Sequence, residues 1–169
     1  HLKGSSRIIA ISRSVADLLV QIGFSAERIE VVHNGVEPTK DPLREPVGDD
    51  ILVIARHARN KNVGDALHGF ARFLKLQSSW EGSLIIVGSF DRATSDLKRL
   101  ALALGIESRI RWISHLDQES FQQILRSSFC LISASLMEGF DYPLLEAQSC
   151  GLPTLASDIP VHRELHSQN

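Results

Sequence analysis

The stretch SASLMEGFDYPLLEA, residues 133–147, decides the fold because it joins an expected buried strand to an expected helix. The apolar run at residues 129–132 leads into it and predicts a buried parallel strand. Pro143 suits the first turn of a helix, and apolar residues continue a helical pattern until a glycine and a proline stop it. Glu138 is therefore expected in a loop at the carboxyl end of a strand, and Glu146 on the helix that follows.

This position suits an anion site. Ligands of open α/β sheets bind beyond the carboxyl ends of the strands, and a helix N-terminus there offers unpaired N–H groups to a phosphate. Gly139 has no side chain to keep a ligand from the backbone. Glu138 and Glu146 can accept hydrogen bonds from hydroxyls on either side of the phosphate, which suits a nucleotide sugar. By spacing alone, a solvated position in the first helical turns is an alternative explanation of Glu146.

The motif resembles the donor-site signature of retaining glycosyltransferases with the GT-B fold. More narrowly, it is similar to the large family (family 4-like, group 1) that includes many bacterial mannosyl- and glucosyltransferases. The segments that carry the resemblance are EGFDYP (138–143), EA (146–147), GLP (151–153) and ASD (156–158). Glu138 and Glu146 are separated by seven residues, as the two glutamates of the family are. Asp141 departs from the family, which often has glycine there; a carboxylate can cap the helix, but it places negative charge near the expected diphosphate.

The resemblance also implies roles for particular residues. Arg56 and Lys61, which follow the apolar strand at 51–55, match the arginine and lysine that hold the diphosphate of the donor. Glu138 matches the residue that orients the transferred sugar, so these three are the expected catalytic residues. The expected substrate-binding residues are Gly88, Arg111, Ile113, Gly139, Phe140, Asp141, Tyr142 and Glu146. Within this set Glu146 is expected to hold the ribose, and the backbone around 111–113 to pair with the nucleobase. From the residues alone, an ordinary solvated loop is the alternative for the cationic segment 56–62.

The reaction that the resemblance implies is transfer of a hexose with retention, without a metal ion or a cofactor. The donor is expected to be a nucleoside diphosphate sugar, with GDP-mannose preferred to UDP sugars. The acceptor, a glycan or a lipid-linked glycan, is expected to bind the N-terminal domain of the family, so the isolated chain is expected to be inactive. A non-catalytic donor-like assembly module and an epimerase or phosphorylase of the same fold stay open, and a flavodoxin-like binding domain is the generic alternative.

The rest of the chain predicts an α/β fold. Expected strands at 51–55, 83–87, 109–113, 129–132 and 154–156 alternate with helical patterns. This order predicts a doubly wound parallel sheet with helices on both faces, which is Rossmann-like and forms one half of a GT-B fold.

The resemblance divides the chain into two parts. It assigns residues 1–33, with a strand at 7–12, a helix at 15–22 and a strand at 29–32, to the tail of the N-terminal (acceptor) domain or to an interdomain segment. Residues 34–169 are expected to be the C-terminal donor-binding domain, truncated at its end, and its 37–50 segment to be a surface loop or linker.

Composition narrows the class of protein. The 169 residues carry a net charge of −2 and are 43% hydrophobic, which is usual for a soluble domain and atypical of an electrostatic nucleic-acid binder. No apolar run approaches the roughly 20 residues of a membrane-spanning helix, and the first residues lack the apolar segment of a signal peptide. Cys130 and Cys150 lack metal-type spacing and are expected to be buried free thiols in a reducing compartment, and the scattered histidines predict no metal site. We expect a cytoplasmic protein whose full-length form can associate peripherally with the inner face of the membrane.

Overall fold

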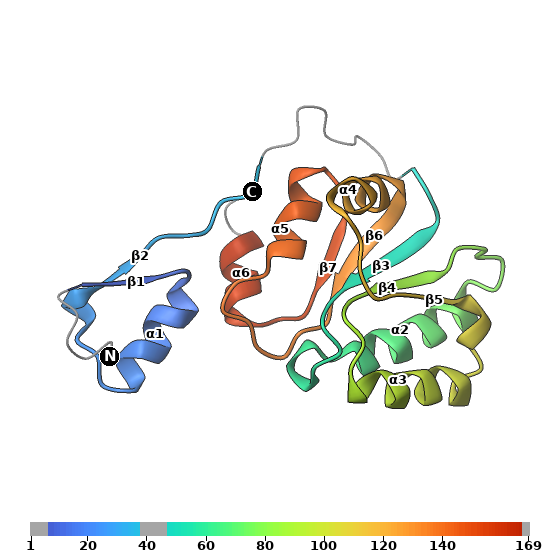
Figure 1. The fold of residues 1–169 in the computed structure, drawn as a ribbon, viewed down its shortest axis with the longest axis horizontal. Helices are drawn as coiled ribbons and strands as arrows, with labels where there is room; N and C mark the ends of the chain where they lie inside the picture. Colours follow the sequence, from blue (N-terminus) through green and yellow to red (C-terminus); the bar gives the residue numbers. More distant parts are fainter. Residues whose placement is uncertain (1–6, 38–46, 167–169) are drawn as a thin grey trace.

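The main body is a parallel sheet of five strands in the order β5-β4-β3-β6-β7 (Figure 1). A computed structural model describes residues 7–37 and 47–166 of the chain. The strands are β3 (Asp50–Ile54), β4 (Leu84–Val87), β5 (Ile110–Ile113), β6 (Ser128–Ser133) and β7 (Thr154–Ala156). Every neighbouring pair is parallel. The predicted Rossmann-like sheet is therefore confirmed, and each of its strands lies within one or two residues of its predicted range.

Helices cover both faces of this sheet, as a doubly wound fold requires (Figure 1). One face carries α2 (Val63–Leu76) and α3 (Arg92–Ala103). The other face carries α4 (Gln118–Ser127), α5 (Tyr142–Ser149) and α6 (Pro160–His166). Short 3-10 turns, η3 (Arg59–Lys61) and η4 (Glu107–Arg109), precede α2 and β5. All strands of the sheet run in one direction, so the loops that leave their carboxyl ends meet at one edge.

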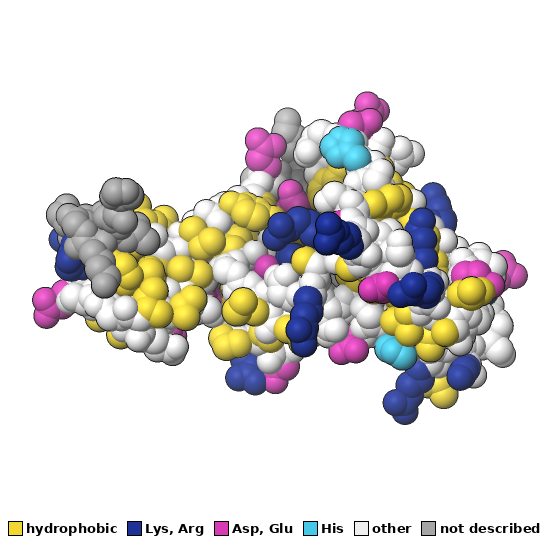
Figure 2. Space-filling view, turned by 60° about the horizontal axis from the view of Figure 1, so that its bottom comes forward, with side chains coloured by type: hydrophobic (Ala, Val, Ile, Leu, Met, Phe, Trp, Pro, Cys, Tyr) yellow, Lys and Arg dark blue, Asp and Glu magenta, His cyan; other side chains and the backbone are white. Residues whose placement is uncertain are grey.

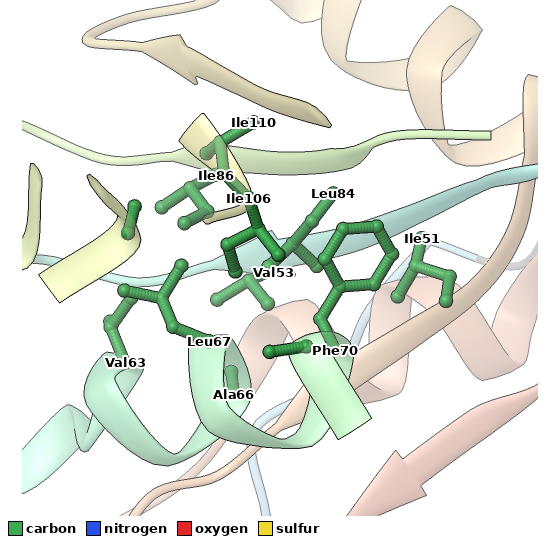
Figure 3. Packing of buried hydrophobic residues seen from close by; sticks show 12 residues of the cluster. Ile51, Val53, Val63, Ala66, Leu67, Phe70, Leu84, Ile86, Ile106 and Ile110 are labelled. Atoms are coloured by element: carbon green, nitrogen blue, oxygen red, sulfur yellow. The ribbon is translucent and has the colours of Figure 1, made fainter. Parts of the chain in front are cut away.

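The first core lies between α2, α3 and the sheet. Val63, Leu67 and Phe70 recur at helical spacing along α2 and pack against Val53 and Ile86 (Figure 3). Strand β4 is buried along its whole length because helices cover it from both sides, which explains its uninterrupted apolar sequence. This packing fixes the end of β3, and with it the loop that begins at residue 55.

The second core fixes α5 and α6. Leu144 of α5 and Leu165 of α6 pack in one buried cluster with Leu52 and Leu131 of the central strands. Because α5 follows the loop after β6 directly, this packing holds the first turn of α5 at the carboxyl edge of the sheet.

The N-terminal segment forms a small unit beside the body (Figure 1). It comprises β1 (Ile8–Ala10), α1 (Arg13–Gln21), the 3-10 turn η2 (Ala26–Arg28) and β2 (Ile29–Val31), and β1 and β2 pair in parallel. Ser12 caps α1 by accepting a hydrogen bond from the N–H of Val15, and its hydroxyl donates to the carbonyl of Gly139 at 2.8 Å. The backbone N–H of Arg13 donates to the carboxylate of Glu164 in α6. The predicted strand, helix and strand are all present, and residues 38–46 of the expected 37–50 loop lie outside the described residues.

The surface is mixed in character. On the face in Figure 2, Lys and Arg side chains lie in several separate groups among hydrophobic and acidic side chains. In the described part of the chain, no helix has the length and apolar character needed to cross a membrane. Cys150 is buried, whereas Cys130 is half-buried, and burial raises the pKa of the Cys130 thiol to about 11. Cys130 therefore stays protonated at neutral pH and is a poor nucleophile.

Candidate active site

The loops after β3, β4, β5 and β6 enclose a cavity of about 470 Å³ at the carboxyl edge of the sheet. Four of the predicted site residues, Arg56, Lys61, Gly88 and Glu138, come together in its wall. Pro143, in the first turn of α5, lines it as well. The full lining is Ile54, Ala55, Arg56, Lys61, Val87, Gly88, Ser89, Ser114, His115, Leu116, Phe121, Glu138 and Pro143.

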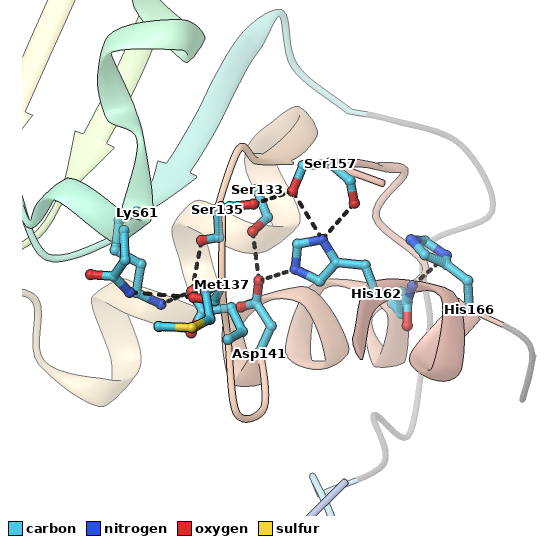
Figure 4. Close-up of polar contacts among 11 residues, drawn as sticks. Lys61, Ser133, Ser135, Met137, Asp141, Ser157, His162 and His166 are labelled. Carbon is cyan, nitrogen blue, oxygen red and sulfur yellow. Dashed lines mark hydrogen bonds and ion pairs between the residues drawn. The ribbon is translucent and has the colours of Figure 1, made fainter. Parts of the chain in front are cut away.

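Lys61 and Glu138 form an ion pair at this cavity. Lys61 is labelled in Figure 4. Their side chains are only 15% and 8% exposed, so water screens the pair weakly. Ser135 donates its hydroxyl to the same oxygen of Glu138 at 2.6 Å. The lysine comes from η3 and the glutamate from the loop after β6, so the tertiary fold creates this pair. An anion in the cavity would give Lys61 a second partner and leave Glu138 free for a neighbouring hydroxyl.

Two further positive groups face the same space. Arg56 follows β3, is exposed, and within the described residues makes no hydrogen bond or ion pair, so its guanidinium is available to an anion. The first turn of α5 has no side-chain cap, which leaves its backbone N–H groups and the positive end of the helix dipole open to a ligand.

Gly88 is required by the packing of the loops. A Cβ atom at this position would lie 1.9 Å from the carbonyl oxygen of Ala55, and the N–H of Gly88 donates to the carbonyl of Ile113 at 2.9 Å. The glycine therefore lets the ends of β3, β4 and β5 approach closely enough to form the cavity wall. A donor contact at Gly88 stays a prediction.

Glu146 lies one turn beyond Pro143 on α5 and is half-buried, but it is not part of the cavity lining. Burial raises the pKa of its carboxyl group above the usual range. Among the described residues its carboxylate has no hydrogen-bond partner or ion pair. Hydroxyl groups of a ligand would offset the cost of holding this charge, so the position suits the predicted ribose contact.

Three predicted substrate-binding residues lie elsewhere. Arg111 pairs with Asp50 at 3.1 Å, at the amino end of the strands, so the structure does not bring its side chain to the cavity. The side chain of Phe140 is buried in the second core. Gly139 lines a different cavity of about 490 Å³, between α1 and the loop after β6, and a side chain would fit there because the nearest atom, Val15 Cγ2, is 3.5 Å away. Any donor contact at these residues is therefore left to backbone atoms.

Ile113 and Tyr142 lie at the edge of the site. Ile113 ends β5, and its carbonyl already accepts the N–H of Gly88. Tyr142 is the first residue of α5 and is exposed, with its ring 5.4 Å from that of Phe140. Trp112 packs partly against the first core and lies edge-on to His57 at 5.6 Å, which favours a core role over base recognition.

Asp141 does not cap α5, and that expectation is wrong. It stands at the N-cap position, but its side chain makes no capping hydrogen bond and is turned into the interior. Its Oδ2 accepts hydrogen bonds from Ser133 at 2.5 Å and from His162 at 3.0 Å (Figure 4). Burial opposes ionisation of Asp141, but these hydrogen bonds and the charge of Lys61 outweigh burial and lower its pKa. The negative charge that the motif places near the diphosphate site is thus paired inside the protein.

Several cavity residues were not predicted. Ser89 follows β4, residues 114–116 follow β5, and Phe121 lies on α4. The strand ends carried a usable signal, because any residue directly after a parallel strand lies at the ligand edge. The partners of Asp141 carried none, since His162 meets it only through the docking of α6. Within residues 7–37 and 47–166, no group of three or more His, Cys, Asp or Glu side chains is placed to hold a metal ion.

Comparison with known sequences places the chain in a family. The profile described as Glycosyl transferases group 1 matches residues 39–169, and that of Glycosyltransferase Family 4 matches residues 2–40. The chain belongs to the group 1 glycosyl transferases. It is 28% identical over 167 residues to the GDP-mannose:cellobiosyl-diphosphopolyprenol alpha-mannosyltransferase of Xanthomonas oryzae pv. oryzae, covering 97% of this chain and 43% of the relative. It is 30% identical over 158 residues to the lipopolysaccharide 1,6-galactosyltransferase of Salmonella typhimurium, covering 89% and 42%. The chain thus spans less than half the length of these relatives.

Solved structures have the same fold as this chain. The apo form of the lipopolysaccharide outer core galactosyltransferase WaaB superposes with a TM-score of 0.70 at 28% identity, covering 91% of this chain and 43% of that one. Anabaena Alr3699/HepE, solved in complex with UDP and glucose, gives a TM-score of 0.80 at 19% identity, covering 95% and 46%. The architecture is therefore half of a GT-B glycosyltransferase.

Proposed function

We propose that this chain is the donor-binding part of a glycosyltransferase that takes a hexose from a nucleoside diphosphate sugar. The observation that carries the proposal is that Arg56 and Lys61, from the connection after β3, and Glu138, from the loop after β6, line one cavity at the N-terminus of α5. Family membership supports the reaction class. Residues 34–169 would form the donor domain, and residues 1–33 would belong to the acceptor domain or to the segment that joins the two.

The geometry supports a mechanism based on charge. Negative charge grows on the diphosphate as it leaves, and Arg56, Lys61 and the N-terminus of α5 are fixed positive partners for it. Lys61 would exchange its contact with Glu138 for the diphosphate, which frees Glu138 to hold hydroxyls of the transferred sugar. Glu146 would hold the ribose. The work of these residues is positioning and electrostatic stabilisation, with retention of configuration as the family resemblance implies.

For the sugar, we propose mannose delivered as GDP-mannose. Similarity to mannosyltransferases, including the one from Xanthomonas oryzae named for GDP-mannose, supports this choice. The acceptor would be a glycan or a lipid-linked glycan bound by the rest of the full-length protein, at the inner face of the membrane. The isolated chain would bind donor nucleotide with little turnover, because transfer needs both substrates in one cleft.

Calorimetric titration of the chain with GDP, UDP and ADP tests the donor site. We expect one nucleotide to bind, and Arg56→Ala and Glu146→Gln each to weaken it about tenfold or more, since a hydrogen bond to a charged group contributes roughly 1.5–3 kcal/mol. Arg59→Ala is the matched control, because Arg59 is an exposed cation of the same loop that does not line the cavity. Equal losses in all three variants, or no binding by a folded chain, would contradict the donor site.

A further inference from the structure

The pair formed by Asp141 and His162 is the most deeply buried ion pair among the described residues. Their side chains are 3% and 2% exposed, and Asp141 Oδ2 lies 3.0 Å from His162 Nε2 (Figure 4). Asp141 ends the loop after β6, whereas His162 lies on α6. The pair therefore ties the loop that carries Glu138 to a helix that does not line the cavity of about 470 Å³.

Both ring nitrogens of His162 face oxygen atoms that can accept a hydrogen bond. Nδ1 lies 2.8 Å from the carbonyl of Ser157, which can only accept a hydrogen bond. The hydroxyl of Ser157, at 3.3 Å, gives its own hydrogen to the carbonyl of Ser135, so it too accepts from Nδ1. Nε2 faces the carboxylate of Asp141, which also accepts the hydroxyl of Ser133. The lowered pKa of Asp141 and the raised pKa of His162 agree with this geometry, so His162 is a buried imidazolium paired with a carboxylate.

The same network reaches the site. Ser157 holds the carbonyl of Ser135, and the hydroxyl of Ser135 donates to Glu138. The N–H of Leu136 donates to the carbonyl of Asn60 at 2.8 Å, which joins the loop to the segment that carries Lys61. His162 thus supports the loop after β6 at both ends, through Asp141 at its end and through Ser157 and Ser135 near its start.

We propose that His162 is a positioning residue of the donor site, which neutralises Asp141 and holds the loop so that Lys61 is left to Glu138 and the diphosphate. The proposal rests on the proposed function. It also explains how this chain accommodates a carboxylate where the family resemblance leads one to expect glycine.

The consequence of losing His162 follows from the charges around Asp141. The charge of Lys61 already helps to lower the pKa of Asp141, after the hydrogen bonds of His162 and Ser133. Without the imidazolium, Asp141 becomes an unpaired carboxylate whose remaining cation is Lys61. It would then compete with the diphosphate for that lysine.

A double-mutant cycle on nucleotide affinity tests this. At pH 6.5, His162→Gln should weaken binding of the nucleotide that the unmodified chain prefers by about tenfold or more. Asp141→Asn/His162→Gln, which removes both charges, should return the affinity to within about threefold of Asp141→Asn alone. Arg163→Gln is the matched control, since Arg163 lies on the same helix as His162 and the change breaks only an exposed ion pair with Asp158. Circular dichroism ensures that only folded variants are compared.

Recovery of nucleotide affinity in the double variant would support the positioning role. If His162 has only a structural role, folded His162→Gln should bind the nucleotide as tightly as Arg163→Gln does. That second result would overturn the proposal. If the unmodified chain binds none of the nucleotides, the proposed function fails. The coupling between the Asp141–His162 pair and Glu138 is then tested by NMR of the nucleotide-free chain. Two protonated ring nitrogens of His162 at pH 6.5, with a shift of the Glu138 amide in His162→Gln larger than in Arg163→Gln, would support the coupling. A neutral His162, or an unmoved Glu138 amide, would overturn it.

Discussion

Asp141 and His162 should make stability depend on pH. Burial opposes the charged form of His162, but the hydrogen bonds to Asp141 and to the Ser157 carbonyl outweigh burial and raise its pKa above 6.5. The pKa of Asp141 is lowered below 3.8. The stabilisation from His162 is fully present below pH 6.5 and is lost as pH rises through its folded pKa. The stabilisation from Asp141 is present above pH 3.8 and is lost as pH falls through its own folded pKa.

Unfolding by urea at a series of pH values measures how the free energy of unfolding depends on pH. We expect the free energy of unfolding to fall as pH rises above 6.5, and Asp141→Asn/His162→Gln to flatten that fall. Asp141→Ala alone should lose about 3–5 kcal/mol, because it leaves a buried charge without a partner. An unchanged slope in the double variant would show that the pair is not the source.

At Gly88, the effect of a substitution on stability should be steric and not electrostatic. Gly88→Ala should destabilise the chain by about 1–3 kcal/mol, because the new Cβ would lie 1.9 Å from the Ala55 carbonyl oxygen and the loop must shift. Gly69→Ala is the control, since Gly69 lies in α2 with no atom within 4 Å of the new Cβ. That change should stabilise by about 0.5–1 kcal/mol. Thermal unfolding distinguishes the two, and equal effects would contradict the steric account.

At the level of single residues, the strand ends allowed the positions of four residues to be predicted, while their roles stay predictions. Arg56, Lys61, Gly88 and Glu138 each follow a predicted strand, and all four line the cavity. Sequence reasoning failed for Asp141, because the choice between capping α5 and pairing with a histidine is made by tertiary packing. Nothing in the local sequence indicates that α6 supplies that histidine.

At the scale of elements, α2 should contribute much of the stability. It spans Val63–Leu76, and Phe70 on its inner side is 2% exposed. Phe70→Ala should cost about 3–5 kcal/mol, because it removes buried apolar surface and leaves a cavity. Leu76→Ala, at a residue of the same helix that is 72% exposed, should change stability by no more than about 0.5 kcal/mol. Similar losses at both positions, measured by urea unfolding, would mean that the inner side of α2 is wrongly assigned.

The elements were predictable because their apolar spacing is regular. Strand β4 reads as a continuous apolar run, and it is buried throughout. The start of α1 is the clearest difference, since it begins at Arg13 and not at Val15. The cap at Ser12 fixes that start.

At the scale of the whole molecule, the sheet order explains why residues far apart in sequence form one site. Strand β3 lies between β4 and β6, so the loops that carry Arg56, Gly88 and Glu138 leave neighbouring strands at the same edge. The parallel order could be predicted from alternating strands and helices. The depth of the cavity and the ion pair between Lys61 and Glu138 could not, because they depend on how the loops pack.

The most direct test of the donor site is a map of backbone amide shifts by NMR as GDP or UDP is added. The account predicts that shifts cluster at Arg56 and Lys61, at residues 88–89 and 114–116, and in the first turn of α5. The α1 side of the second cavity, which is lined by Asp17, Leu18 and Gln21, should stay unchanged. Shifts centred on that second cavity, or none at all in a folded chain at millimolar nucleotide, would contradict the assignment of the donor site.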